Sequence, residues 1–295
     1  MLHAMQAGYQ FLRSLLGGMC VLVLAAELAA HGAEELPAVS NVLQRVVERA
    51  QLVARASQTN HYAYEKRTVT AELDEDERVI KSTEKIYEVM VIGGLPFPRL
   101  LKIQGLELTA KELEKENERE TAFRQKMMRA TAPHLTPSSA SNGESGEATK
   151  SARTTRGKKR EGMVTKEIVD RFEFKVAKRE VIDGRATLVL LFAPRPGAPE
   201  KTIEDKVYRH VSGTVWVDEK EAEVTRLDAS VLNPIPLGWF GAVGALNKFQ
   251  ATVERSRMPD GVWVNRRSSF WIVARKFFST MRSKTTEESS RFRRE

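Results

Sequence analysis

One stretch in the second half of the chain, residues 213–232, restricts the possible folds more than any other. Residues 215–217 read Val-Trp-Val, and β-branched and aromatic residues suit the pleated surface of a strand. The polar and small residues 219–223 reverse the chain, and from Thr225 to Val231 apolar or small side chains alternate with Arg, Asp and Ser. Such alternation is typical of a strand with one buried face and one wet face. The stretch therefore predicts a hairpin at the centre of a large antiparallel sheet.

The flanking sequence predicts further hairpins around this one. The acidic turn 74–77 joins two strand-like segments, and Asp-Gly pairs at 183–184 and 260–261 each lie between alternating apolar runs. Asp-Gly favours a tight hairpin because both turn residues adopt positive φ. Besides the central hairpin, we predict strands over residues 60–73, 78–92, 97–103, 172–182, 185–192, 246–258 and 262–273. The total is about eight to ten strands, nearly all in sequential hairpins.

Two long helices and one short helix accompany these strands. Residues 37–57 carry Val and Leu three and four positions apart, with Arg45 and Arg49 on the wet face, which predicts an amphipathic helix over the sheet. A helix lying on a membrane surface is the alternative. Residues 109–129 begin with a capping box but are almost wholly charged in the middle. We expect this second helix on the outside, touching the body at its ends, and a short helix within residues 201–210.

Two segments fit neither strands nor long helices. Residues 132–162 are rich in Pro, Ser, Gly, Lys and Arg, and cannot bury enough apolar surface to offset the entropy of ordering them. They predict a disordered insertion within one domain. Residues 233–244 are apolar but rich in Gly and Pro, which predicts a loop. Its Trp239 and Phe240 lie either at the mouth of a cavity or in the core, and the sequence leaves both open.

Basic residues gather in two places. The chain has 47 Lys and Arg against 39 Asp and Glu, a formal net charge of +8, and much of the excess lies in residues 150–160 and 275–294. These are either solvated segments or patches for an anionic membrane surface or an acidic partner. Nucleic acid is disfavoured, because no aromatic residues are interleaved with the cations of 150–160. Residues 275–295 close the chain, and we expect Phe277 and Phe278 to dock on the body and the last turn to fray.

The N-terminus predicts an export signal. Arg13 precedes the apolar run 15–26, which is too short to span a bilayer comfortably, and small residues follow at 29–33. We therefore assign residues 1–33 to a signal peptide and expect the mature chain in the periplasm, with an uncleaved membrane anchor as the alternative. The single cysteine, Cys20, lies inside this run, so the mature chain would contain no thiol.

The mature sequence lacks the motifs of common enzyme sites. His61, His134 and His210 lie far apart, without a second ligand at metal-binding spacing. There is no Gly-x-Ser-x-Gly elbow and no phosphate-binding loop. The sequence therefore predicts no metal site, no cofactor and no catalytic residues, and it favours a binding protein over an enzyme.

Five short motifs in the second half together resemble a known family. They are Asp183-Gly184-Arg185, Phe192-Ala193-Pro194, Gly213-Thr214-Val215-Trp216-Val217-Asp218, Val224-Thr225-Arg226-Leu227 and Asp260-Gly261-Val262-Trp263. Together with the export signal, the single amphipathic helix and the long antiparallel meander, they make the chain similar to the periplasmic carriers of outer-membrane lipoprotein sorting (the LolA/LolB-like superfamily). The resemblance covers residues 37–273 apart from the insertion.

The resemblance implies an α+β fold: an open, unclosed antiparallel β-barrel whose concave apolar face is covered by helices, formed as a single domain by residues 34–295. It implies a monomeric carrier that holds lipid or lipoprotein acyl chains without a covalent step, at about 0.8 kcal/mol per buried CH₂. The expected ligand-lining residues are Val215, Val217, Leu227, Ala229 and Val231, with Trp239 and Phe240 near the cavity mouth. The alternative is an envelope sensor or protein-interaction module on the same fold, without lipid transfer, whose sheet is filled by its own side chains.

Overall fold

The computed structural model describes residues 35–56, 62–131, 165–198, 203–231, 233–237, 244–277 and 279–294. The chain divides into a unit of residues Met1–Pro37 and a compact unit of residues Ala38–Glu295, and the second unit is described here by itself. The predicted signal peptide (1–33) and the predicted disordered insertion (132–162) lie outside the described residues.

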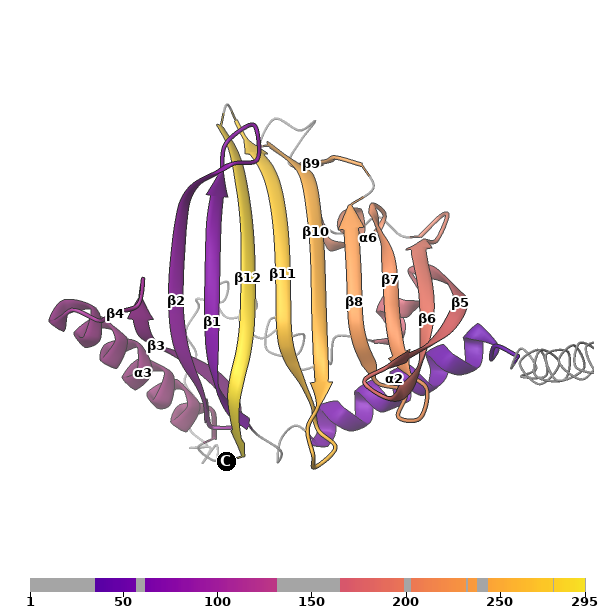
Figure 1. The fold of residues 1–295 in the computed structure, drawn as a ribbon, viewed down its shortest axis with the longest axis horizontal. Coiled ribbons are helices and arrows are strands. Elements are labelled where there is room, and N and C mark those ends of the chain that lie inside the picture. Colours follow the sequence, from indigo (N-terminus) through magenta and orange to yellow (C-terminus); the bar gives the residue numbers. More distant parts are fainter. Residues whose placement is uncertain are drawn as a thin grey trace, which may run out of the picture. The chain divides into compact units, whose positions relative to one another are not determined.

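One antiparallel sheet of 12 strands forms the body of this unit, in the order β4-β3-β2-β1-β12-β11-β10-β8-β7-β6-β5, with β9 paired to β10 (Figure 1). The strands are β1 Tyr62–Leu73, β2 Val79–Ile92, β3 Leu95–Ile103, β4 Leu106–Glu107, β5 Phe172–Ile182, β6 Arg185–Pro194, β7 Val211–Asp218, β8 Val224–Val231, β9 Ile235–Leu237, β10 Gly244–Arg257, β11 Trp263–Lys276 and β12 Ser279–Arg294. The strand path ends at β4 and β5, which do not pair with each other in the described sheet, so the sheet stays open. The predicted fold class, an open antiparallel β-barrel of the α+β type, is confirmed.

The last strand lies in the middle of the sheet, between the first strand and β11. Pairs such as Thr70↔Thr285 join β12 to β1, and Phe270↔Thr285 joins it to β11. The expectation that the chain end frays is therefore wrong. The sequence of β12, STMRSKTTEESSRFRR, has few apolar residues and so carries little period-two signal. Its backbone pairs on both sides, and that pairing does not depend on apolar side chains.

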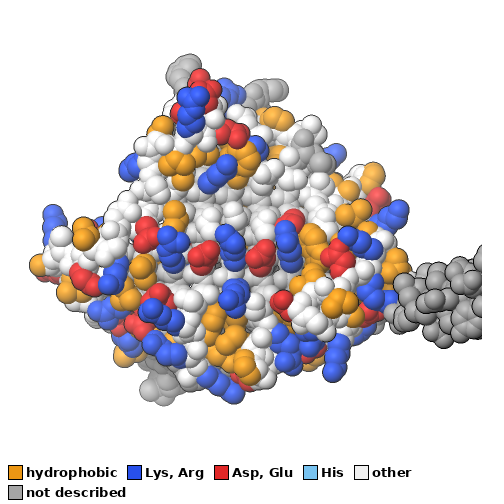
Figure 2. Space-filling view, in the orientation of Figure 1, with side chains coloured by type: hydrophobic (Ala, Val, Ile, Leu, Met, Phe, Trp, Pro, Cys, Tyr) orange, Lys and Arg blue, Asp and Glu red, His pale blue; other side chains and the backbone are white. Residues whose placement is uncertain are grey.

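The two faces of the sheet differ in chemistry. On one face, which we call the helix face, apolar side chains of β5 to β8 contact α2 (Val39–Ala56), α5 (Lys166–Val169) and α6 (Ile203–Tyr208). The other face is charged, and Figure 2 shows Lys or Arg alternating with Asp or Glu in a row across it. Ion pairs along this row include Arg67–Glu288 (3.8 Å), Arg267–Glu288 (3.7 Å) and Arg226–Glu254 (3.6 Å). The prediction that residues 37–57 form a helix over the sheet is confirmed.

The second long helix, α3 (Ala110–Thr131), packs on β2 and β3 from its middle, at Glu116, toward its C-terminal part, at Arg124. Glu116 lies in its charged middle and is only 7% exposed, because its carboxylate accepts a hydrogen bond from the Leu100 backbone N–H (2.9 Å) and pairs with Arg119. Phe123 stacks on Phe97 with ring centroids 5.0 Å apart. The expectation that only the helix ends touch the body is wrong, since a charged residue can be buried when it is paired. No helix in the described part of the chain is long and apolar enough to cross a membrane.

Of the two predicted Asp-Gly turns, the structure confirms the one at Asp183-Gly184 and shows a wider turn at Asp260-Gly261. Asp183 and Gly184 both have positive φ (50° and 74°), as a two-residue turn requires. At the second pair Gly261 has φ 88°, whereas Asp260 is not among the residues with positive φ. The turn there is wider, with the Met258 N–H bonded to the Val262 carbonyl oxygen (2.7 Å).

Two expectations for apolar segments also change. Phe277 does not dock on the body: it lies in the turn between β11 and β12 and is 56% exposed, whereas Phe278 lies outside the described residues. Residues 233–244, predicted as a loop, contain the short strand β9, which pairs Ile235 with Leu246 of β10. A three-residue strand is too short to show a hydrophobic period, so the sequence alone could not distinguish it from a loop.

Candidate functional site

The candidate site is the helix face of the sheet beneath α2. Val42 and Val46 of α2 are buried against Leu188 and Leu190 of β6 and against Val217 of β7. The strand register places these sheet residues together, because Leu188 lies opposite Val217 and Leu190 lies opposite Val215. The apolar stripe of α2 and the alternation of β6 and β7 therefore meet in one cluster, as their periods of 3.6 and 2 predict.

The predicted ligand-lining residues divide between this cluster and a second one. Val217 is part of the α2 cluster and Val215 packs against it. Leu227, Ala229 and Val231 instead pack against a cluster of Phe172, Phe192 and Val211, which is joined by Ile168 of α5 and by Val207 and Tyr208 of α6. Trp239 and Phe240 lie outside the described residues. The five valine, leucine and alanine residues thus share one face of the sheet, and their role in ligand binding stays a prediction.

The apolar surface continues along the helix face beyond β8. Ala251 of β10 lies opposite Ala229 on one side and Phe270 of β11 on the other, and Phe249 lies opposite Ile272. In Figure 1, α2 runs across the lower ends of β8, β7 and β6, and no described helix crosses β11, β12 or β1. The apolar face is therefore wider than the helix that lies on it.

The helix face becomes polar on the next strands. The hydroxyl oxygens of Thr70 (β1) and Thr285 (β12) lie 3.3 Å apart, and the Lys66 ammonium lies 3.1 Å from the Glu287 carboxylate. The register places Thr285 directly opposite Phe270 of β11. One continuous face thus carries an apolar part on β5 to β11 and a polar part on β12 and β1, an arrangement that matches amphipathic molecules.

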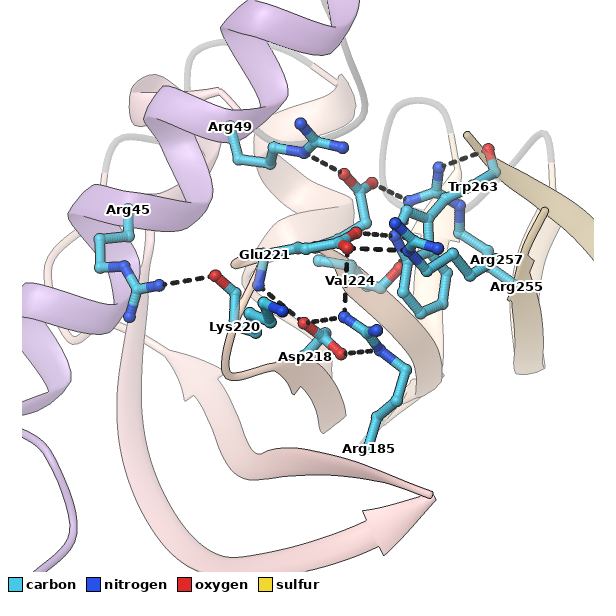
Figure 3. A network of polar contacts seen from close by, with 11 residues as sticks. Arg45, Arg49, Arg185, Asp218, Lys220, Glu221, Val224, Arg255, Arg257 and Trp263 are labelled. Atoms are coloured by element: carbon cyan, nitrogen blue, oxygen red, sulfur yellow. Dashed lines mark hydrogen bonds and ion pairs between the residues drawn. The ribbon is translucent and has the colours of Figure 1, made fainter. Parts of the chain in front are cut away.

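A polar network, which we call the turn clamp, attaches α2 to the β7–β8 turn, residues 218–223 (Figure 3). Arg45 donates hydrogen bonds to the carbonyl oxygens of Glu219 (2.9 Å) and Lys220 (3.2 Å). One turn further along the helix, Arg49 Nε donates to Glu223 Oε2 at 2.9 Å. Because residues four apart lie on the same side of a helix, both arginines reach the same turn.

The turn clamp extends from the turn to the centre of the sheet. Arg255 of β10 pairs with Glu223 and donates to the carbonyl oxygens of Val224 (3.0 Å) and Trp263 (3.1 Å). Glu221 accepts from Arg257 Nε (2.8 Å) and from the indole N–H of Trp263 (2.7 Å). α2 is therefore connected through charged side chains to β10 and β11, the strands into which the apolar part of the helix face continues.

Asp218 is the buried anchor of the turn clamp, with 1% of its surface exposed. Arg185 of β6 donates to both of its carboxylate oxygens, at 2.5 and 2.9 Å, and the Glu221 backbone N–H donates at 2.7 Å. Burial by itself raises the pKa of Asp218, but the hydrogen bonds and the charge of Arg185 outweigh it and hold the pKa below the ordinary value. The carboxylate is therefore ionised and fully engaged at neutral pH.

This pKa shift predicts that the protein loses stability in acid. Since the pKa of Asp218 is lower in the folded chain, its contribution is present above the unfolded value of about 4 and is lost as the pH falls through the folded value. We expect Asp218→Asn to be less stable than the wild type at neutral pH and to lose less additional stability between about pH 5 and about pH 2. Urea unfolding at each pH, followed by tryptophan fluorescence, measures the difference. Parallel pH profiles for the two proteins would contradict the assignment.

Sequence reasoning assigned Arg45 and Arg49 to the wet face of α2 and did not connect them to the sheet. A signal was present, because two arginines four residues apart border the apolar stripe and the acidic turn 218–223 carries the opposite charge. The partner of a charged side chain depends on which turn lies next to it, and a single sequence does not specify this.

The described residues show little that points to catalysis. They contain no group of three or more His, Cys, Asp or Glu residues that could hold a metal ion. The carboxylates of Asp218, Glu221 and Glu223 are each bonded to arginine, which suits them to attachment rather than proton transfer. A hollow of about 630 Å³ lies along α3, lined by Leu113, Asn117 and Thr121 among others, away from the predicted lining residues.

Comparison with known proteins adds distant structural matches. No protein-family model and no curated protein matches the chain. A DUF1329 family protein from Desulfovibrio piger matches with 12% identity and a TM-score of 0.32, covering 88% of this chain and 93% of that one. A LolA superfamily protein from Nitrosomonas europaea matches with 9% identity and a TM-score of 0.29, covering 85% and 92%. The Pseudomonas aeruginosa complex of MucA with MucB matches with 7% identity and a TM-score of 0.20, covering 83% and 94%. The superfamily named from the sequence motifs is thus among those matched.

Proposed function

We propose that this protein is a periplasmic carrier that binds lipid or lipoprotein acyl chains on the helix face and acts in outer-membrane lipoprotein sorting. One observation carries the proposal: an amphipathic helix, α2, covers only part of a wider apolar sheet face and is attached to it by two buried valines and the turn clamp. An acyl chain binds by apolar burial, without a reaction, and a sheet face with a removable cover can both accept and release it.

The free energy of burying the two buried valines of α2 can be compared with that of burying an acyl chain. Burial of Val42 and Val46 contributes at most about 6 kcal/mol, taking up to about 3 kcal/mol for each side chain. An acyl chain gains about 0.8 kcal/mol per buried CH₂, so about eight buried methylene groups match the two valines. A chain longer than this can take the place of α2 on Leu190 and Val217 and extend toward Phe249 and Phe270. The polar residues of β12 and β1 would then lie next to the head group.

A second candidate function is an envelope sensor or protein-interaction module without lipid transfer. The observation that favours it is the close packing beneath α2, where Leu188, Leu190 and Val217 are 1%, 0% and 2% exposed. In this alternative α2 stays in place, and the sheet interior is filled by the protein's own side chains. The two candidates differ in one measurable property, namely whether loosening α2 changes acyl-chain binding.

The test is a fluorescent fatty acid titration of the wild type and of the double variant Arg45→Ala/Arg49→Ala. If the acyl chain and α2 compete for the sheet, removing the arginine contacts populates the open form and tightens the apparent affinity by about threefold to tenfold. The control is Arg67→Ala, which removes an arginine bonded to Glu84 (2.7 Å) on the charged face. This control should bind like the wild type.

The outcomes separate the candidates. Absence of fatty acid binding by all three proteins, together with no lipid in mass spectra of the extracted protein, rules out the carrier function. Binding that is equal in wild type and clamp variant places the acyl chain elsewhere than under α2. A protein without lipid that captures an envelope protein partner supports the interaction module.

A further inference from the structure

Exposed apolar side chains gather at one end of the sheet, where the β1–β2 turn and the β11–β12 turn lie side by side (Figure 1). We call this end the hairpin edge. Val79, Ile80, Phe277 and Met281 are there, and each is between 55% and 65% exposed. The strand register brings them together, because Leu73 pairs with Val79 while the adjacent Glu72 pairs with Ser283 of β12. Large apolar side chains clustered in water usually mark an interaction site.

The backbone at Phe277 supports the same conclusion. Phe277 has φ 52° and follows Lys276, which pairs with Ser279 across the hairpin. Glycine or asparagine adopts this left-handed conformation readily, whereas a bulky aromatic residue does so at a cost. A strained, exposed phenylalanine is unfavourable for the isolated protein, and such outliers cluster at functional positions. We therefore assign Phe277 a role in contacting a partner.

The charges around the hairpin edge indicate the chemistry of its partner. The carboxylates of the β1–β2 turn are already paired, Glu75 with Arg282 (3.8 Å), Asp76 with Arg78 (3.4 Å) and Glu77 with Lys248 (3.5 Å). Arg275 and Lys284 are exposed, and within the described part of the chain neither has a carboxylate partner. The hairpin edge therefore combines apolar side chains with unneutralised positive charge, as an anionic surface requires.

Trp271 lies next to this edge between two lysines. The ammonium groups of Lys248 and Lys284 lie 3.0 and 4.0 Å from its ring centroid, one from each neighbouring strand. Tryptophan and lysine together are typical of the zone between lipid head groups and acyl chains, where the ring is half-buried and the ammonium contacts phosphate. Figure 2 shows hydrophobic and charged side chains close together at this end.

We propose that the hairpin edge docks on a membrane of anionic phospholipids, with Phe277 and Met281 entering the head-group region and Arg275 and Lys284 contacting the phosphates. This goes beyond the proposed carrier function, because it assigns a separate surface for the membrane. The edge lies at the opposite end of the sheet from the turn clamp, so docking leaves α2 free to move (Figure 1).

The experiment is sedimentation of the full chain with vesicles of phosphatidylcholine alone or of phosphatidylcholine mixed with phosphatidylglycerol. We expect binding to the mixed vesicles that weakens with added salt, because screening reduces contacts between exposed charges. The double variant Phe277→Ser/Met281→Ser should bind the mixed vesicles with an affinity at least about tenfold lower than that of the wild type. The double variant Arg275→Glu/Lys284→Glu should lose the preference for phosphatidylglycerol. The matched control is Val181→Ser. Val181 is 74% exposed, but it lies near the end of β5, beside the β5–β6 turn at the other end of the sheet.

Three results would overturn the proposal. They are no binding of the wild type to mixed vesicles, equal binding by the Phe277→Ser/Met281→Ser variant, and a wild-type dimer in light scattering that this variant dissociates. Thermal unfolding of each variant checks that it is folded. Fatty acid binding by the hairpin-edge variants should equal that of the wild type, so failure of membrane docking and failure of the carrier function give different results.

Discussion

Replacing Asp218 by alanine is expected to lower the free energy of unfolding by about 3–5 kcal/mol, because the substitution breaks a buried ion pair from one side. Arg185 would lose both carboxylate contacts, and the Glu221 backbone N–H would lose its acceptor. Asp218 stabilises the conformation of the β7–β8 turn through these bonds. Without them, the turn would no longer hold its acceptors in place for Arg45 and Arg49 of α2. Urea unfolding at neutral pH measures the loss.

The control for this prediction is Asp228→Ala. Asp228 also pairs with an arginine, Arg226, at 2.8 Å, but its side chain is 32% exposed on the charged face. Water replaces the lost partner there, so we expect a change of about 0–1 kcal/mol. Equal losses for the two variants would show that burial of Asp218 does not set the strength of the turn clamp.

The second large effect is expected at Gly213 in β7. A Cβ atom at this position would lie 1.9 Å from the backbone carbonyl oxygen of Asp228 in β8. Because the obstructing atom belongs to a paired strand, no side-chain rotation relieves the clash and the two strands must separate locally. We expect Gly213→Ala to cost about 3 kcal/mol or more, at the upper end of the range for overpacking.

Gly105→Ala is the matched control for Gly213→Ala. Gly105 has φ +76°, but a Cβ there meets no atom within 4 Å. The change should cost about 1–2 kcal/mol through backbone conformation alone. Thermal and urea unfolding of the two variants compare the two causes directly. A smaller loss at Gly213 than at Gly105 would mean that β7 and β8 are less tightly paired than the register indicates.

Several elements could be predicted because their signals are local. The alternation of residues 224–231 predicts a strand with an apolar and a polar face, and in β8 Leu227, Ala229 and Val231 pack on the helix face while Arg226 pairs with Asp228 on the charged face. Asp183-Gly184 predicts a tight turn, and both residues have positive φ. The spacing of valines in residues 37–57 predicts an amphipathic helix over the sheet, and α2 lies there. In each case the pattern is contained within about one element, so neighbouring residues determine the result.

The candidate site was only partly visible in the sequence. The apolar residues Val215, Val217 and Leu227 were found on one face, because side-chain alternation assigns faces without knowledge of the partner strand. Their division between α2 and α6, and the contacts of Arg45 and Arg49 with the β7–β8 turn, were not found. The two hydrogen bonds of Arg45, for example, join residues that are 174 and 175 positions apart in the sequence.

By itself the sequence determined that this chain forms an antiparallel sheet with one apolar face and an amphipathic helix to cover it. Period and turn chemistry act between neighbouring residues, and they suffice for that much. Only the tertiary structure decided that β12, a strand with little apolar signal, completes the middle of the sheet beside β1. It likewise decided which turn α2 is attached to and that Phe277 points into solvent. Those outcomes depend on backbone pairing and on charges brought together from distant segments, and neither leaves a periodic trace in the sequence.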